Sequence, residues 1–205
     1  MSTITASKLG ERVQRVVNGG STKPELKIHK RDAILAVLQA RDEAIVNLMY
    51  EKKAMGEHSF PYDIISTLDT TVQGGSAPLP KRGLSVLKHN SGIYRVTTVC
   101  DNLTDEVELI PTTIGFNTLF KGLQGKLLGG HPSYQPIGDK IQVQGVSDGS
   151  KLKIEMVVAG EEFTEDEFLA IPPSLENKVF QIAVQTLTVM INAQSDLITD
   201  AKPNF

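Results

Sequence analysis

The last long segment of the chain, Ser174 to Thr199, has apolar residues at the spacing of two neighbouring faces of one helix. The first face carries Leu175, Val179, Ile182, Ala183, Met190, Ala193 and Leu197, and the second carries Phe180, Val184, Leu187, Ile191 and Ile198. Pro172 and Pro173 precede the segment, where proline favours the first turn of a helix. Because a helix that is apolar on two sides cannot leave one side bare to water, we expect it either to be buried in its own domain or to turn one face toward another subunit.

The two faces lead to different expectations for individual residues. If the second face is the intersubunit one, Leu187 and Ile191 are interface residues. Ile182 and Met190 then belong to the core, where a buried unpaired charge would unfold the domain.

Two further helices are predicted near the N-terminus. Ser7 to Val17 has apolar residues on one side, and Gly19-Gly20 is expected to end that helix because glycine adopts the left-handed cap conformation without a steric penalty. A second helix is predicted from about Lys30 to Lys53, with Gly56 after its end. Its apolar stripe consists of Ile34, Val37, Leu38, Ile45, Leu48 and Met49, and Arg41, Asp42, Glu43 and Asn47 are expected on its remaining surface.

Between the helices, alternation and β-branched residues predict several strands. The predicted strands are Asp63 to Val72, Gly92 to Val99 with its hairpin partner Val107 to Ile110, the hairpin Tyr134 to Ile137 and Lys140 to Val146, and Lys151 to Ala159. Leu84 to Leu87 fits a strand or a helical turn, and the spacing within Pro111 to Leu128 predicts a short helix. Gln73 to Gly83 and Gly125 to Ser133 are predicted loops.

This order of elements predicts an α+β fold with N-terminal helices, a small antiparallel sheet with hairpins and a long C-terminal helix. We expect one domain over residues 1–205, because no second domain boundary and no internal repeat are evident in the sequence. A composition of 40% hydrophobic and 22% charged residues fits an ordinary globular domain rather than a disordered chain.

Charge, cysteine content and the absence of long apolar stretches indicate which partners and which cellular compartment to expect. A net charge of −3 gives no general case for binding nucleic acid. Cys100 is the only cysteine, so no intrachain disulfide forms and a reducing compartment is expected. The N-terminus lacks the pattern of a signal peptide, and no apolar stretch is long enough to span a bilayer. These features predict a soluble protein made in the cytoplasm, with no membrane partner.

The sequence contains none of the phosphate-binding, nucleophile-elbow or zinc-protease motifs. Cys100 is a nucleophile candidate, but Asp101 beside it disfavours the thiolate, which favours a structural cysteine. The acidic run from Glu161 to Glu167 lacks the glycine-containing loop of a calcium site and is better explained as a solvated turn. We therefore predict no catalytic residue, no metal site and no cofactor.

Two oppositely charged segments lie far apart in the sequence and are candidate interface residues. The basic one carries Lys23, Lys27, Lys30 and Arg31, and the acidic one carries Glu161, Glu162, Glu165, Asp166 and Glu167. If they lie on opposite flanks of the domain, they could meet between neighbours in a head-to-tail ring. Two alternatives stay open, namely that both segments are solvated or that they pair within one chain.

The layout resembles short phage connector proteins of the podovirus tail-tubular-protein-A or gatekeeper type, and the ring proteins of crAss-like phages. The stretches that carry the resemblance are 30–42, 92–96, 109–111, 134–141 and 171–176. The resemblance implies a structural virion protein of the neck or tail, and a homo-oligomeric ring, expected to be a dodecamer. That ring would lie below the portal protein, contact other neck and tail ring proteins, and form part of the channel through which genomic DNA passes.

Three other functions stay open on the sequence. One is another minor virion or tail-completion protein. A second is a nucleic-acid-binding module that uses the basic segment, for which binding would depend steeply on salt. The third is a small hydrolase that uses Cys100.

Overall fold

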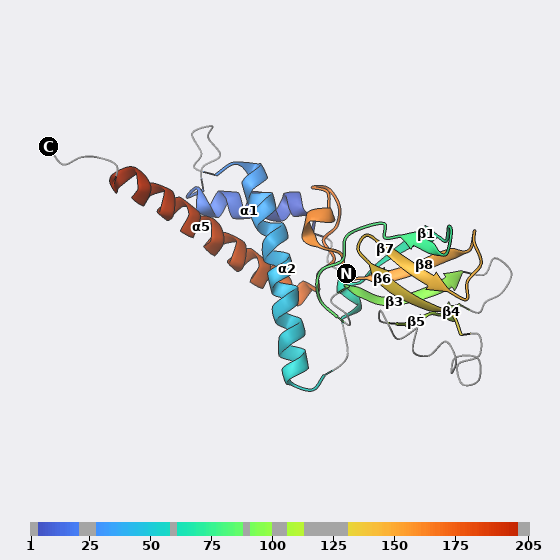
Figure 1. Ribbon diagram of the computed structural model, residues 1–205. Helices are drawn as coiled ribbons and strands as arrows, with labels where there is room; N and C mark the ends of the chain where they lie inside the picture. Colours follow the sequence, from blue (N-terminus) through green and yellow to red (C-terminus); the bar gives the residue numbers. More distant parts are fainter. Residues whose placement is uncertain are drawn as a thin grey trace. The chain divides into compact units, whose positions relative to one another are not determined.

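The computed structural model describes residues 4–20, 28–57, 61–87, 91–99, 106–112 and 131–200, with side chains described as far as Asn192. The fold is α+β, as predicted, with two N-terminal helices, two small four-stranded sheets and a long C-terminal helix (Figure 1). No boundary within the chain was predicted from the sequence, whereas the contacts between residues divide the chain into two compact units. The helical unit comprises Met1–Ile64 and Ala159–Phe205, and the β unit comprises Ile65–Val158.

The helical unit is built from three long helices. They are α1 (Ala6–Val17), α2 (Lys30–Ala54) and α5 (Glu176–Asp200), with short 3-10 turns at η1 (Tyr62–Ile64), η3 (Gly160–Glu162) and η4 (Pro173–Leu175). Both α1 and α5 pack against α2, and α1 also packs against α5. The buried side chains between them include Leu9, Val13, Val37, Ile45, Val179, Ala183 and Leu187. All three long helices confirm the predicted elements to within a few residues.

The ends of α1 and α2 show why these boundaries were readable from the sequence. Thr5 Oγ1 accepts a hydrogen bond from the Lys8 N–H at 3.3 Å at the start of α1. At its end, the Gly20 N–H donates to the Arg15 carbonyl at 2.7 Å, with Gly20 at a φ of 84°. Gly56, at a φ of 73°, follows α2 at the position that Gly19, at a φ of 64°, has after α1, and the Glu57 N–H donates to the Lys52 carbonyl at 2.9 Å. A positive φ at the residue after a helix favours glycine, which is why these glycines mark the helix ends.

The β unit contains two four-stranded sheets. The first has the strand order β1 (Ser66–Thr71), β8 (Lys151–Met156), β3 (Ile93–Val99) and β4 (Val107–Glu108). The second has the order β2 (Ser76–Pro78), β7 (Lys140–Gln144), β6 (Ser133–Ile137) and β5 (Ile110–Pro111). All neighbouring pairs are antiparallel except β5 and β6, which are parallel.

Alternating apolar residues supply the core of the β unit. β8 buries Leu152, Ile154 and Met156 and exposes more of the residues between them. Ile141 and Val143 of β7 are buried in the same alternation. The chain passes from the first sheet to the second twice over short distances, from β1 to β2 and from β4 through the buried Leu109 to β5. The predicted pairing of β6 with β7 is present, and β3 pairs with β4 as predicted. The strand predicted from Val107 to Ile110 is divided, however, because Ile110 belongs to β5 in the second sheet.

Several predictions for this region were wrong in detail. The segment predicted as one strand from Asp63 to Val72 begins as the η1 turn and becomes β1 only at Ser66. The predicted loop 73–83 contains β2. Residues 84–87 form neither a strand nor a helical turn. Most of the helix predicted within Pro111 to Leu128 lies outside the described residues, which omit 113–130.

Candidate functional site

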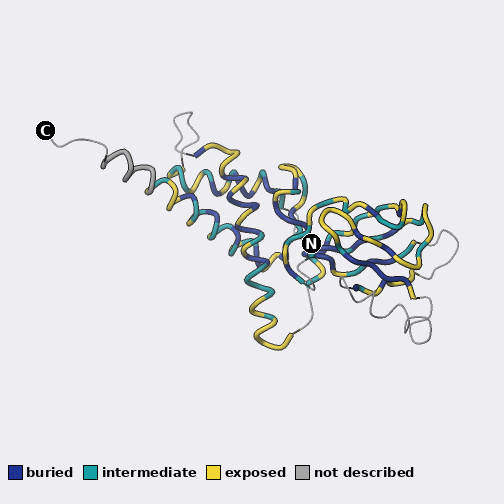
Figure 2. The backbone as a smooth tube through the Cα atoms, in the orientation of Figure 1, coloured by how far each residue is buried: buried dark blue, intermediate teal, exposed yellow. Residues whose placement is uncertain are grey.

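The first half of α5 is held in the core by one row of side chains. Leu175 at the end of η4 and Val179, Ala183 and Leu187 of α5 are buried at four-residue intervals. Figure 2 shows buried positions recurring along this part of the helix. Lys178 Nζ adds an ion pair with Glu51 Oε1 of α2 at 3.1 Å. A row at i, i+4, i+8 drifts around a helix of 3.6 residues per turn, so it passes from one predicted face to the other.

Leu187 therefore belongs to the core of its own chain, and its prediction as an interface residue was wrong. Its side chain is only 2% exposed. The reason is the drift of the buried row, which carries Leu187 onto the side of α5 that packs within the unit.

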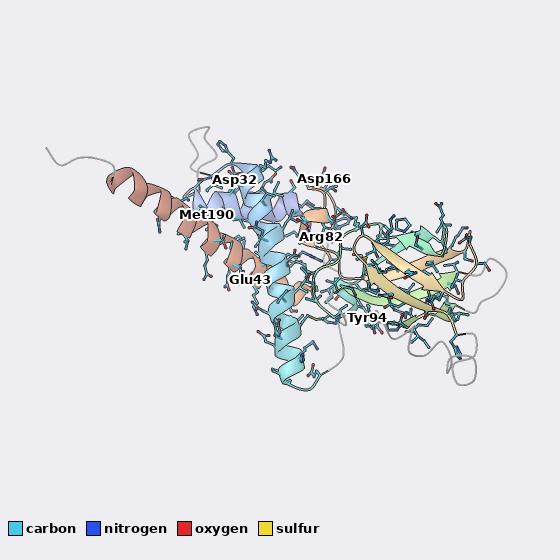
Figure 3. The ribbon with its side chains drawn as sticks, viewed as in Figure 1. Asp32, Glu43, Arg82, Tyr94, Asp166 and Met190 are labelled. Carbon is cyan, nitrogen blue, oxygen red and sulfur yellow. The ribbon has the colours of Figure 1, made fainter. Side chains whose placement is uncertain are left out.

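The side chains of α5 change from buried to exposed or partly exposed after Leu187. In the described side chains after Leu187, residues 188–192, none is buried. Met190 lies seven residues after the buried Ala183, on nearly the same side of the helix, yet it is 50% exposed (Figure 3). Val189 is 67% exposed, and Ile191 is partly exposed. The prediction that Met190 is a core residue was wrong, because the core ends one turn before it.

We call residues 188–200 the α5 extension. It stays helical to Asp200. Its sequence continues with Leu197 and Ile198, seven residues after Met190 and Ile191, so the apolar pattern of the core-facing side repeats along it. A helical face of this composition is typical of a surface that a partner covers.

The acidic segment lies beside the start of α1. The Ser7 N–H donates to the Glu165 carbonyl at 3.0 Å, and the Leu169 N–H donates to the Ile4 carbonyl at 3.0 Å. Glu161, Glu165 and Asp166 are exposed, and Glu162 and Glu167 are partly exposed.

The basic segment is described at Lys30 and Arg31, while Lys23 and Lys27 lie outside the described residues. Lys30 Nζ forms an ion pair with Glu11 Oε1 at 2.9 Å. That hydrogen bond raises the pKa of Lys30, and the negative charges of Glu165 and Asp166 raise it further. Lys30 is therefore on the same side of the helical unit as the acidic segment, and the condition of opposite flanks is not met at this residue.

A buried charged pair fixes the acidic segment to α2. Arg41 is fully buried, although it was predicted on the solvent side of the helix. Its Nη1 donates to Asp42 Oδ1 at 2.7 Å, its Nη2 donates to the Ala170 carbonyl at 3.2 Å, and its guanidinium lies 4.6 Å from the centre of the Phe163 ring. Burial lowers the pKa of the Arg41 guanidinium, and the Asp42 carboxylate offsets part of that effect.

The position of Arg41 in the sequence is the signal that would have predicted its burial. Arg41 stands four residues after Val37 and four before Ile45, on the buried stripe of α2.

The described residues contain no cluster of three or more histidine, cysteine, aspartate or glutamate side chains that could hold a metal ion. Cys100 lies outside the described residues, so its candidate roles remain predictions from the sequence. Over the described parts of the chain, no helix is long and apolar enough to cross a membrane.

Neither the protein-family models nor the curated proteins compared with this sequence match it. The resemblance to phage connector proteins therefore stays a prediction from the layout of the sequence. The α5 extension is the feature of the described structure that most needs a functional explanation.

Proposed function

We propose that this protein is a structural virion protein, the subunit of a head–tail connector ring that lies below the portal and forms part of the DNA channel. Its main partner is a further copy of itself, in a ring expected to be a dodecamer. Portal and other neck or tail ring proteins lie above and below it, and genomic DNA passes through it transiently.

The observation that carries the proposal is the exposed apolar side of α5 beyond Leu187. Met190 lies where the packing pattern of α5 would place a core residue, and half of its surface is exposed in the single chain. Covering such residues stabilises an assembly by about 25 cal/mol for each Å² of apolar surface removed from water. A ring subunit has this requirement, because every copy must present one surface that its neighbour covers.

The acidic average charge is compatible with a DNA conduit. With a net charge of −3, the chain as a whole does not attract the DNA backbone. A strongly basic lumen would retain the genome through phosphate contacts instead of passing it.

The test is negative-stain electron microscopy of the purified protein, alone and mixed with the portal of the same phage. Rings in the first sample, or added density below the portal in the second, would support the proposal. Single particles of one chain in the first sample, together with an undecorated portal in the second, would contradict it.

Two variants make this test specific to α5. Met190→Asp places a charge on the exposed apolar side and is expected to prevent ring formation. Gln185→Asp places the same charge on the opposite, exposed side of the helix and is the matched control.

A further inference from the structure

The α5 extension has an acidic sequence. After Lys178, the ionisable residues of α5 are Asp196 and Asp200, so the sequence gives this part of the helix two negative charges and no positive one. Two copies of the extension packed in parallel would place these acids against one another, and juxtaposed like charges are unfavourable. The charge pattern therefore favours a partner surface that is basic and partly apolar.

The outer face of α1 has this character. Lys8 and Arg15 are exposed on it, and Val16 is 55% exposed. Arg12 is exposed as well, but its guanidinium lies 5.3 Å from the centre of the Phe180 ring of α5 in the same chain. Lys8 and Arg15 make no ion pair with any residue that the structure describes. The acid of this helix, Glu11, is already bound to Lys30. Because the acidic segment lies beside the start of α1, the positive charge of this face is least offset toward Arg15, where Val16 supplies an apolar residue at its edge.

The two surfaces also match in length. α1 has 12 residues and is about 18 Å long at a rise of about 1.5 Å per residue. The α5 extension, residues 188–200, is about 20 Å long by the same rise.

Another exposed apolar site of the helical unit, at the end of α2, is a weaker partner. The end of α2 exposes Tyr50 and Met55, but its charges are largely paired. Lys52 binds Glu57 at 2.8 Å, and Glu51 binds Lys178 at 3.1 Å. This end offers little net positive charge to an acidic helix.

We infer that the α5 extension of one copy docks along the outer face of α1 in a second copy, so that the acidic sequence of the extension meets the basic residues of α1. The inference rests on the proposed ring, because it names the surfaces that join neighbouring subunits. The two surfaces belong to different helices, so the contact is heterologous. A row of copies joined in this way has an unoccupied α1 face at one end and an unoccupied α5 extension at the other. Such contacts close into a ring when the rotation between copies allows it.

Charge reversal tests this contact. One variant carries Lys8→Glu and Arg15→Glu, and the other carries Asp196→Lys and Asp200→Lys. Each reversed protein presents like charges on its two docking surfaces, so each alone is expected to assemble about tenfold more weakly, or worse, than the wild type. An equal mixture is expected to regain assembly, because each reversed surface then meets a surface of opposite charge on the other variant.

Sedimentation velocity measures assembly in the wild type, each variant and the mixture. The matched control reverses two exposed lysines elsewhere, Lys53→Glu and Lys140→Glu, and is expected to sediment as the wild type does. Recovery in the mixture supports the contact, since a misfolded variant cannot be rescued by mixing.

Two results would overturn the inference, and they are distinguishable. If the wild type assembles and the α1 reversal assembles equally well, the ring stands and α1 is not its docking surface. If the wild type remains a single chain even with the portal, the proposed function fails together with the inference.

Discussion

Both carboxylate oxygens of Asp42 accept a hydrogen bond from the backbone N–H of Gly160, at 2.9 and 2.8 Å. Asp42 lies in the middle of α2, and Gly160 begins the η3 turn where the chain has returned from the β unit. The same carboxylate binds the buried Arg41, whose guanidinium also reaches the Ala170 carbonyl. This group of contacts fixes the chain from η3 toward α5 onto α2.

Replacing Asp42 by alanine is expected to destabilise the helical unit strongly. The change leaves the buried Arg41 without its carboxylate, and removing one partner of a buried ion pair costs about 3–5 kcal/mol. Urea unfolding followed by circular dichroism measures the loss. The matched control is Asp69→Ala on the exposed face of β1, which is expected to change the free energy of unfolding by no more than about 0.5 kcal/mol. Equal losses in the two variants would show that the buried pair is not a special contact.

Asp42 also gives a prediction for pH. Burial raises the pKa of Asp42 above its ordinary value of 3.8, and the hydrogen bond from Gly160 and the charge of Arg41 offset only part of that rise. The Asp42 carboxyl therefore stays protonated to higher pH in the folded protein than in the unfolded chain. The contribution of Asp42 to stability is greatest below 3.8 and falls as pH rises through the folded-state pKa.

The measurement is the free energy of unfolding of the wild type and of Asp42→Asn at several pH values from below 3.8 to neutral. The variant is less stable throughout, but its curve lacks the fall that Asp42 causes just above that pH. If the difference between the two proteins instead grows as pH rises, the pKa of Asp42 is lowered by folding and this reasoning is wrong.

Substitution by alanine is expected to reduce the free energy of unfolding much more at Leu187 than at Met190. Leu187→Ala removes a buried side chain, so a loss of about 2–5 kcal/mol in the free energy of unfolding is expected. Met190→Ala changes an exposed side chain and is expected to cost less than about 1 kcal/mol in the single chain. Thermal and urea unfolding measure both losses, at a protein concentration low enough for assemblies to dissociate into single chains. A larger loss at Met190 would restore the core role that its helical spacing predicted.

Gly92 provides a prediction for the β unit. It has a φ of 71°, and a Cβ there would lie 2.7 Å from the Leu84 carbonyl oxygen and 2.9 Å from the Val157 carbonyl oxygen. Gly92→Ala is expected to cost about 3 kcal/mol or more, since the backbone strain and the steric clash add. Gly138→Ala is the matched control, with a φ of 61° and open space around it, and is expected to cost about 1 kcal/mol. Equal losses would show that the close backbone approach at Gly92 relaxes freely.

The parts of this fold that the sequence predicts are those that depend on residues close together in the chain. Apolar periodicity and the glycines at 20 and 56 locate α1 and α2, because helix formation and termination depend on neighbours within one or two turns. β2 was missed because Ala77 and Pro78 lie in a stretch rich in glycine and proline. Their strand character comes from pairing with Ile141 and Lys140, far along the chain.

The errors in the candidate site have a different physical cause. Arg41 was placed in solvent by its residue type, although its position lies on the buried stripe and Phe163 covers its guanidinium. Met190 was placed in the core by its spacing, although periodicity shows which side of a helix faces inward and not where the partner helices end. Both errors depend on tertiary contacts between segments more than a hundred residues apart.

The central claim is that the apolar side of α5 beyond Leu187 joins copies of this protein. Its most direct test is sedimentation velocity, at high protein concentration, of the wild type, Met190→Asp and the control Gln185→Asp. We expect the wild type and the control to sediment as the same large assembly, and Met190→Asp to sediment as a folded single chain of 22.3 kDa. The account would be contradicted if all three proteins sedimented alike, whether as single chains or as assemblies.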